Sequence, residues 1–375
     1  MTISAKGVLG VSLATLLLSS SSLPQAQAAT KFVANNGIDS SVCGTTAATA
    51  CRSIGQAIAN AFDGDVIVVG PGRYGDLNDD GAFTDPGDET FPGACGCMIQ
   101  VNKSVTIISR DGAASTILDA AGNGVNVVSI SSTGAVFGVL KRGFTLIGGD
   151  NGVVVESSAN NVLVDGNTAN GNGTDGFQDL GTDSVFFKNV STENGNDGFN
   201  VLGTAPALLN NLATVNINHG FELQTTDAFV RANVSTANSA NGFHIRGAND
   251  SSRLTGNIAD SNLGDGFRLR SATNILLFAN STVGNHNFGI NLSNLSTNIV
   301  IQKNNIFGNA VPAGSPNCGL VNNTPSDIDA RFNFWGAASG PGPTEPSDNI
   351  CDQSTGVTDT SLPSTKEFKI KPGAP

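Results

Sequence analysis

Short runs of alternating apolar and polar residues recur along the middle of the chain. In each run an apolar residue is followed by a polar residue and then by another apolar residue. Apolar side chains at every second position place one face of an extended strand in a core and leave the other face outside it. The pattern therefore predicts short strands at Phe199-Asn200-Val201, Phe221-Glu222-Leu223, Phe243-His244-Ile245, Phe267-Arg268-Leu269 and Ile290-Asn291-Leu292.

These strands belong to an internal repeat. In each unit an Asn is followed five residues later by a second Asn and four residues after that by a Gly, and successive glycines lie 22 to 24 residues apart. A fixed period of this length is typical of a solenoid, in which each unit is one coil. The sets are Asn167/Asn172/Gly176, Asn189/Asn194/Gly198, Asn211/Asn216/Gly220, Asn233/Asn238/Gly242, Asn257/Asn262/Gly266 and Asn280/Asn285/Gly289, and a seventh begins at Asn304/Asn309.

The local pattern indicates which solenoid this is. Several short strands in a coil of this length fit a parallel β-helix, and the Leu-rich consensus of leucine-rich repeats is missing. Equivalent residues of neighbouring coils should then lie ~4.8 Å apart. We expect the Gly before each strand to form a tight turn with unusual backbone angles. We expect the two Asn columns to be structural, with their amides bonding to turn backbone and to one another.

The ends of the chain differ from the repeat. Lys6 is followed by an apolar run from Val8 to Leu18 and by Ala26-Gln27-Ala28, a small-x-small cleavage site, which predicts a secretory signal over residues 1–28. An uncleaved membrane anchor is the alternative, but the apolar run is too short to span a bilayer. We expect the β-helix over residues 29–345, a C-terminal tail over 346–375, and a secreted or cell-surface protein.

The first part of the mature chain predicts a helix and a first coil. It reads KFVANNGIDS, then CRSIGQAIANA, then DGDVIVVGPGRY, and Ile54, Ile58 and Ala61 would share one helix face. A solenoid needs such a plug over its end coil. From about Lys31 to Pro343, ending in NFWGAASGPGP, the chain resembles right-handed parallel β-helix proteins of the pectin-lyase-like superfamily, of the uncharacterised bacterial secreted type. That resemblance implies an all-β fold with an N-terminal helical cap, and the fold serves lyases, hydrolases, epimerases and non-catalytic surface proteins alike.

Composition and cysteine content restrict the classes of protein to which the chain can belong. The 375 residues carry a net charge of −12, only 13% are charged, and 46 are Gly without a three-residue period. This excludes collagen and disorder, and it disfavours nucleic acid as a partner. Export permits disulfides, and proximity favours Cys43–Cys51 and Cys318–Cys351, whereas a Cys95–Cys97 bond would close a small, strained ring. Zinc is the competing use of these cysteines, but the chain has no CxxC pair and only three His.

The outward positions of three successive strands carry the main candidate site. They present Glu222 and Gln224, then His244 and Arg246, then Arg268 and Arg270, whereas the flanking strands offer Asn200 and Asn291. Neighbours up the stack should be ~4.8 Å apart, so the cations would crowd one patch. An acidic polysaccharide would compensate them, because Arg pairs well with carboxylates. The alternative is a solvated face without a ligand.

A catalytic version of this hypothesis assigns roles to the same residues. In β-elimination or C5 epimerisation of a uronate, Arg246, Arg268 and Arg270 would neutralise the carboxylate, His244 would act as base or acid, and Glu222 would orient His244. The acid motifs of polygalacturonases, the vWiDH and RxPxxR patterns of pectate lyases and the DPH triplet of alginate epimerases are absent. The sequence therefore leaves open whether the chain is an enzyme, and a non-catalytic surface, adhesion or structural protein is the alternative.

Three further groups of acidic or turn residues stand out. The loop from Asp76 to Glu89 begins like a calcium loop, with Asp76, Asn78, Asp80, Asp85 and Asp88 as candidate ligands, although Gly87 stands at the usual twelfth position. A plain acidic loop is the alternative.

The residues before the turn glycines are expected to be ordinary turn residues. Asp179 stands where other repeats have an inward apolar residue, and we expect a local bulge to turn it outward. The turn residues are Asp175, Asp197, His219, Asn241 and Asp265.

Overall fold

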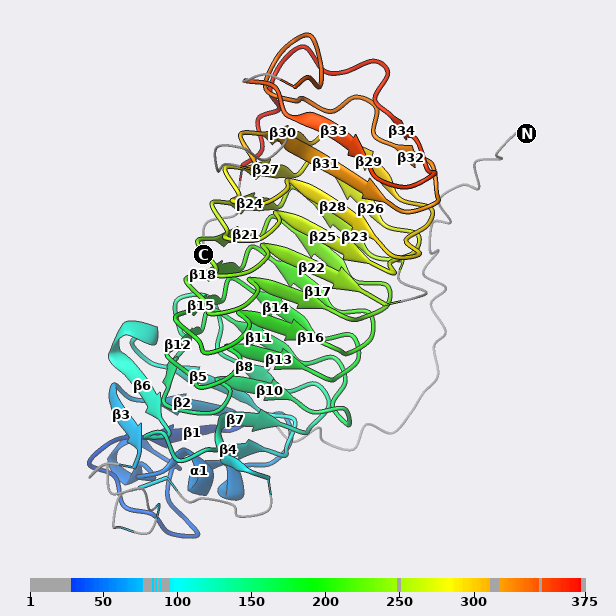
Figure 1. Cartoon of the computed structure of the whole chain (residues 1–375). Helices are drawn as coiled ribbons and strands as arrows, with labels where there is room; N and C mark the ends of the chain where they lie inside the picture. The colour runs from blue at the N-terminus through cyan, green and yellow to red at the C-terminus, as the bar shows by residue number, and fades with distance from the viewer. Residues whose placement is uncertain are drawn as a thin grey trace, which may run out of the picture.

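Three parallel β-sheets run the length of a rod, and the chain passes from one sheet to the next in every coil (Figure 1). The structure is a computed structural model that describes residues 28–76, 83, 85, 88–89, 95–247, 251–310, 317–343 and 346–371. The fold is a parallel β-helix, as the repeat predicts, and it is right-handed, as the resemblance implies. The predicted signal peptide lies outside the described residues except for its last position.

Sheet A has 13 strands within the described residues: β1 (Thr30–Val33), β2 (Val66–Val69), β5 (Thr106–Ser109), β8 (Val136–Phe137), β11 (Leu163–Asp165), β14 (Val185–Phe187), β17 (Ala207–Leu209), β20 (Phe229–Arg231), β23 (Arg253–Thr255), β26 (Leu276–Phe278), β29 (Val300–Gln302), β32 (Ile328–Asp329) and β34 (Thr358–Asp359). Sheet B has ten there: β3 (Gly72–Gly75), β6 (Thr116–Asp119), β9 (Thr145–Ile147), β12 (Thr168–Asn170), β15 (Val190–Thr192), β18 (Leu212–Thr214), β21 (Val234–Thr236), β24 (Ile258–Asp260), β27 (Ser281–Val283) and β30 (Asn305–Phe307).

Sheet C has 11 strands in the same part of the chain: β4 (Cys97–Val101), β7 (Asn126–Ile130), β10 (Val153–Val155), β13 (Phe177–Asp179), β16 (Phe199–Val201), β19 (Phe221–Leu223), β22 (Phe243–Arg246), β25 (Phe267–Arg270), β28 (Ile290–Ser293), β31 (Cys318–Asn323) and β33 (Asn349–Asp352). β33 pairs with β31 and β34 pairs with β32, so the sheets continue past residue 345, where a tail was expected. Residues 349–352 add a strand to the edge of sheet C, and residues 358–359 add a strand to the edge of sheet A.

One helix lies at the N-terminal end of the rod. α1 (Ile54–Asn60) begins after Ser53, whose side chain accepts a hydrogen bond from the Gln56 amide. It buries Ile54, Ala57 and Ile58 beside the first strands. Two 3-10 turns occupy Ala47–Thr49 and Ala113–Ser115. The helix is where the sequence predicts it, and its role as a cap stays a prediction.

Inside the rod, identical side chains stack from coil to coil. The rings of Phe177, Phe199, Phe221, Phe243 and Phe267 form one file, with successive centroids 4.7–4.9 Å apart. The rings are offset-parallel neighbours in a closed core, an arrangement that adds to the energy of burial. The prediction that the apolar side chains of these strands face a core, with equivalent residues of neighbouring coils ~4.8 Å apart, is confirmed.

The two Asn columns are buried ladders. Asn233 shows the pattern: its Nδ2 donates to the Leu208 carbonyl at 2.8 Å and to Oδ1 of Asn257 at 3.0 Å. Its own Oδ1 accepts from the backbone N–H and the Nδ2 of Asn211. Each amide thus satisfies turn backbone and the next amide in a dry environment, where unpaired polar groups are costly. The predicted structural role is confirmed.

The glycine before each strand has another role than the predicted one. Gly220 and its equivalents do not have positive φ, so the expectation of unusual backbone angles is wrong. A Cβ on Gly220 would lie 2.0 Å from Oγ of Ser235 and 2.8 Å from the Gly242 carbonyl. The position needs Gly because neighbouring coils approach too closely for a side chain.

Asp179 is the second departure. It lies in regular register between Val155 and Val201, points inward and is 1% exposed, so the predicted bulge is absent. The side chain is held by hydrogen bonds from the Gly181 amide at 3.1 Å and the Ser184 hydroxyl at 2.9 Å. Burial raises its pKa to about 6.

All six cysteines form disulfides. Cys43–Cys51 and Cys318–Cys351 are the pairs that proximity favours. Cys95 and Cys97 are also joined, across a single Gly, although the short ring argued against that bond. No zinc-type use of the cysteines remains among the described residues.

Candidate functional site

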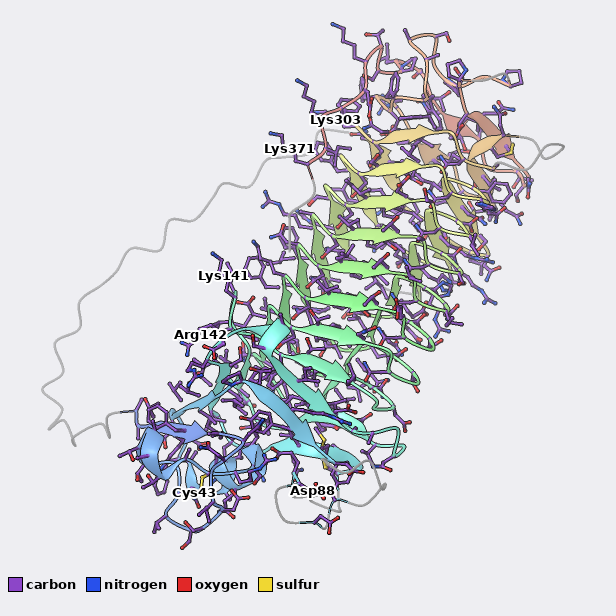
Figure 2. All side chains as sticks on the ribbon, turned by 90° about the vertical axis from the view of Figure 1, so that its left-hand side faces the viewer. Cys43, Asp88, Lys141, Arg142, Lys303 and Lys371 are labelled. Carbon is purple, nitrogen blue, oxygen red and sulfur yellow. A yellow bond between two sulfur atoms is a disulfide. The ribbon has the colours of Figure 1, made fainter. Side chains whose placement is uncertain are left out.

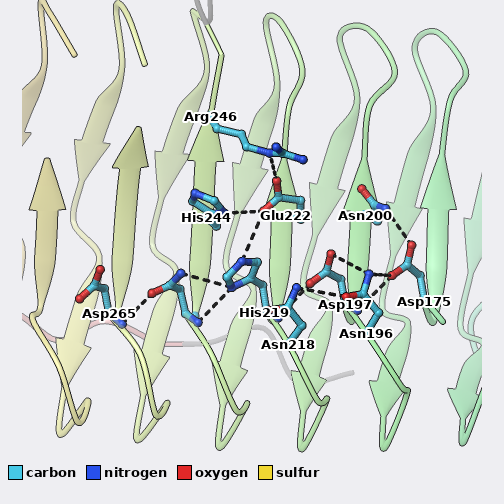
Figure 3. Close-up of polar contacts among 12 residues, drawn as sticks. Asp175, Asn196, Asp197, Asn200, Asn218, His219, Glu222, His244, Arg246 and Asp265 are labelled. Atoms are coloured by element: carbon cyan, nitrogen blue, oxygen red, sulfur yellow. Dashed lines mark hydrogen bonds and ion pairs between the residues drawn. The ribbon is translucent and has the colours of Figure 1, made fainter. Parts of the chain in front are cut away.

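The outward face of sheet C brings the predicted cationic residues together. Glu222 of β19 is in register with His244 of β22, and His244 with Arg268 of β25. Arg246 and Arg270 form the neighbouring column one step further along the same strands. We call Glu222, His244, Arg246, Arg268 and Arg270 the cationic face, and Figure 3 shows its central contacts.

Glu222 is the centre of this face. It is only 4% exposed, because the side chains on the adjacent coils cover it. Nε of Arg246 donates to its Oε1, and Nδ1 of His244 lies 2.7 Å from its Oε2. The His244 contact is close, but its angles do not satisfy hydrogen-bond geometry, so we describe it as an ion pair when the ring is charged. The predicted contact between Glu222 and His244 is present.

The charge of Glu222 follows from its neighbours. Burial alone would raise the pKa of Glu222, but the contacts with His244 and with the Arg246 guanidinium outweigh burial and lower the pKa. Glu222 is therefore ionised at neutral pH. The buried carboxylate holds the Arg246 side chain in place through its Nε.

His219 also contacts this group, and the sequence reasoning did not assign it to the site. Its Nε2 lies 3.8 Å from Oε2 of Glu222, and its ring meets the His244 ring edge-on with centroids 4.7 Å apart. The usable signal was its spacing: His219 precedes Glu222 by three residues across the turn at Gly220, so the two side chains emerge on the same side.

The protonation of His219 is fixed by the next coil. Its Nδ1 accepts a hydrogen bond from the backbone N–H of Asn241 at 3.1 Å, so the proton of the neutral ring is on Nε2, facing Glu222. Burial, followed by the charge of His244, lowers the pKa of His219 to about 4. The ring is neutral at physiological pH, and its Nε2–H faces the carboxylate at 3.8 Å without forming a hydrogen bond.

This tautomer bears on metal binding. His219, Glu222 and His244 bring possible ligand atoms within 4.8 Å of one another. A neutral imidazole binds a metal through an unprotonated nitrogen. In His219 the nitrogen that faces the group carries the proton, and the other nitrogen accepts the Asn241 N–H. The donor set therefore does not fit a metal ion.

His244 is nearly enclosed. Its side chain is 11% exposed, and neither ring nitrogen has a hydrogen-bond partner of good geometry among the described residues. Nε2 is buried rather than presented to solvent. The geometry thus places His244 as a support between Glu222 and Arg268, and a role in proton transfer would require the ring to move.

The arginines are the outward part of the face. Arg246 is anchored through Nε while its side chain remains 45% exposed, and Figure 3 shows its terminal nitrogens directed away from Glu222. Arg268 and Arg270 make no ion pair with any described residue, and Arg270 is exposed. Gln224, which follows β19, is also exposed. These groups can therefore meet a ligand from solvent.

On the coils that flank the cationic face, the outward Asn side chains bond to carboxylates of the turn column. Asn200 donates to Asp175 at 2.8 Å and Asn291 donates to Asp265 at 2.8 Å (Figure 3 labels the first pair). Each turn residue also accepts a backbone N–H from the following coil, as Asp197 does from His219. Burial, with the charges of Asp175 and Glu222, raises the pKa of Asp197 to about 7. The turn column is structural, as expected, and it bounds the cationic face.

The acidic loop is described only in part. Asp76 and Asp88 are buried, and Oδ2 of Asp88 accepts the backbone N–H of Asp85 at 3.0 Å. Asn78 and Asp80 lie outside the described residues. The predicted calcium ligand set therefore stays a prediction.

Two solved structures with the same fold are similar to this chain. The A-module of the mannuronan C-5 epimerase AlgE4 of Azotobacter vinelandii matches at 16% identity and a TM-score of 0.50, over 80% of this chain and 91% of that one. The Dettilon tailspike protein matches at 14% identity and a TM-score of 0.53, over 86% and 68%. No family model and no curated protein matches the sequence. The similarity supports the right-handed parallel β-helix fold.

In the described part of the chain, no helix combines the length and apolar character needed to cross a bilayer.

Proposed function

We propose that the chain binds an acidic polysaccharide on the cationic face of sheet C. The observation that carries the proposal is charge distribution. In a chain of net charge −12, three Arg and one His gather on the adjacent coils of β22 and β25, and the buried carboxylate of Glu222 contacts only Arg246 and His244 of this group. Like charges this close repel unless an anion compensates them.

The geometry suits an extended polymer better than a small ligand. The face lies on regular strands, and its columns repeat every ~4.8 Å along the rod. A uronate carboxylate can take the outer nitrogens of Arg246, while Arg270 in the next coil is available to a neighbouring sugar residue. One of the structurally similar proteins is named for mannuronan, an acidic polysaccharide, which is in keeping with this assignment.

Affinity electrophoresis tests the proposal. The protein is run through native gels that contain polygalacturonate, alginate or a neutral glucan. We expect retardation by the two acidic polymers only, and a variant with Arg268→Gln and Arg270→Gln should bind about tenfold more weakly or worse. The matched control is Arg110→Gln with Lys366→Gln, which removes the same charge from exposed positions elsewhere. Equal loss in both variants would reduce the effect to net charge and contradict the site.

The contact between Glu222 and His244 favours a second candidate function, chemistry on the bound uronate. In β-elimination the base takes the C5 proton, the C4–O bond breaks, a C4=C5 double bond forms, and the leaving oxygen is protonated. Arginines at the carboxylate would make C5 acidic. Ultraviolet absorbance of unsaturated ends, or C5 proton exchange for an epimerase, is measured for the native chain and for His244→Ala. Absence of both signals, with binding retained, favours a non-catalytic surface protein.

Export and calcium are part of the same proposal. Sequencing the N-terminus of protein recovered from the producing cells should show cleavage near Ala28. Calcium bound by the loop from Asp76 to Asp88 should raise the midpoint of thermal unfolding, and EDTA should reverse the shift. An intact N-terminus, or an unchanged midpoint, would count against these two points separately.

A further inference from the structure

A second basic and aromatic surface lies on a different sheet. From β14 to β29, the outward positions of sheet A and the turn residues after them carry four cations and three aromatic rings. We call them the sheet A strip: Phe187, Lys188, Phe229, Arg231, Arg253, Phe278 and Lys303. None of these residues belongs to the cationic face of sheet C.

The centre of the strip combines an open ring with two unpaired cations. Phe229 is 40% exposed, and its register partner in the next coil is Arg253. Arg231 stands two positions along the same strand, so the cations flank the ring at ~4.8 and ~6.8 Å between backbone positions. Both arginines are exposed, and neither forms an ion pair with a described residue. Other coils place Ala207 or Leu276 at the position of Phe229.

Rings and cations recur on either side of this centre. Nζ of Lys188 lies 5.7 Å from the centroid of Phe187, and Nζ of Lys303 lies 5.1 Å from that of Phe278. Phe187, Arg231 and Phe278 occupy one column, each two coils from the next. Figure 2 shows Lys141, Arg142 and Lys303 along one edge of the rod.

We propose that the sheet A strip is a second binding surface for an acidic polysaccharide, separate from the cationic face. An aromatic face takes the C–H face of a sugar ring, and flanking guanidinium groups take its carboxylates in bidentate fashion. Periodic rings and cations along a straight sheet match a linear polymer with an acidic group on its sugars. Two acidic side chains adjoin the strip: Asp227, exposed in the turn two residues before Phe229, and Asp165, the buried register partner of Phe187, which interacts with Lys188. With two such surfaces, one chain can hold two polymer strands and crosslink them.

Calorimetric titration with short oligogalacturonates tests the strip. The native chain should show two sites. A strip variant with Phe229→Ala, Arg231→Gln and Arg253→Gln should keep one site, and the variant with Arg268→Gln and Arg270→Gln should retain the other. All substitutions lie on outward positions, so circular dichroism and the unfolding midpoint should match the native chain. With long polygalacturonate, the native chain should form crosslinked aggregates and the strip variant should not.

Each outcome decides between the two surfaces. A strip variant with native stoichiometry and affinity overturns the second surface and leaves the first intact. If the variant with Arg268→Gln and Arg270→Gln loses all binding while the strip variant loses none, the second surface is likewise overturned and the first stays intact. Binding that is lost only with the strip variant overturns the proposed function of sheet C instead. Duplex DNA or anionic phosphatidylglycerol vesicles serve as competitors, and equal competition by either would overturn the assignment to polysaccharide.

Discussion

Replacing Asn233 by Ala tests whether the ladders stabilise the rod. The substitution removes four hydrogen bonds: two donated by Nδ2, to the Leu208 carbonyl and to Asn257, and two accepted by Oδ1 from Asn211. A buried hydrogen bond contributes about 1 kcal/mol net, and more when a partner is left unsatisfied. The expected loss in the free energy of unfolding is therefore on the order of 4 kcal/mol.

The assay is urea unfolding followed by circular dichroism, in which the midpoint shifts while the slope stays constant. The matched control is Asn218→Ala, because Asn218 is half-buried and lies outside the ladders, with its side chain donating to Asn196 at 3.1 Å. It should cost no more than about 1 kcal/mol. If the two variants lost the same stability, the ladder would be a consequence of coil stacking and the reasoning would be refuted.

Three other substitutions probe the core and the site. Asp179→Asn should stabilise the protein at pH 7. Because the folded-state pKa of Asp179 is raised to about 6, the stability of the native protein should fall as pH rises from the unfolded pKa near 4 through about 6. The unfolding midpoint of the variant should change less with pH over that range. A flat native profile would contradict the buried carboxyl. Glu222→Gln should lower the free energy of unfolding by about 2–3 kcal/mol, since it leaves Arg246 without its buried partner; a gain in stability would show that the cations need no carboxylate. Gly220→Ala should be strongly destabilising, because the nearest atom to the added Cβ would lie only 2.0 Å away. Gly173→Ala should be tolerated, because the nearest atom there would lie 3.6 Å away. Equal unfolding midpoints for the two variants would contradict the close approach of the coils.

Much of the fold was predictable because a solenoid converts sequence period into spatial neighbourhood. The spacing of the Asn and Phe residues alone places them in vertical files, and the files are present. The period cannot predict which local contact requires a particular residue type at a particular position. Gly220 is required by the approach of Gly242 and Ser235 from another coil, not by its own backbone angles. Asp179 stays inward because Ser184 and the Gly181 amide happen to supply its hydrogen bonds.

The site was predictable to the same extent. Alternation and period place Glu222, His244 and the arginines on one face, and their columns are as expected. The strand pattern does not include His219, because it belongs to the turn before β19, and only its spacing of three residues from Glu222 pointed to the site. Its tautomer depends on the backbone of Asn241, 22 residues later. The enclosure of His244 likewise depends on how side chains of three coils pack, which spacing does not specify.

The most direct test of the account is a crystal structure of the protein soaked with an acidic oligosaccharide, such as a short oligogalacturonate. The account predicts sugar density on sheet C, with a carboxylate at the outer nitrogens of Arg246 and another within reach of Arg268 or Arg270. Density confined to the ends of the rod, or an empty sheet C at ligand concentrations that saturate binding in solution, would contradict it.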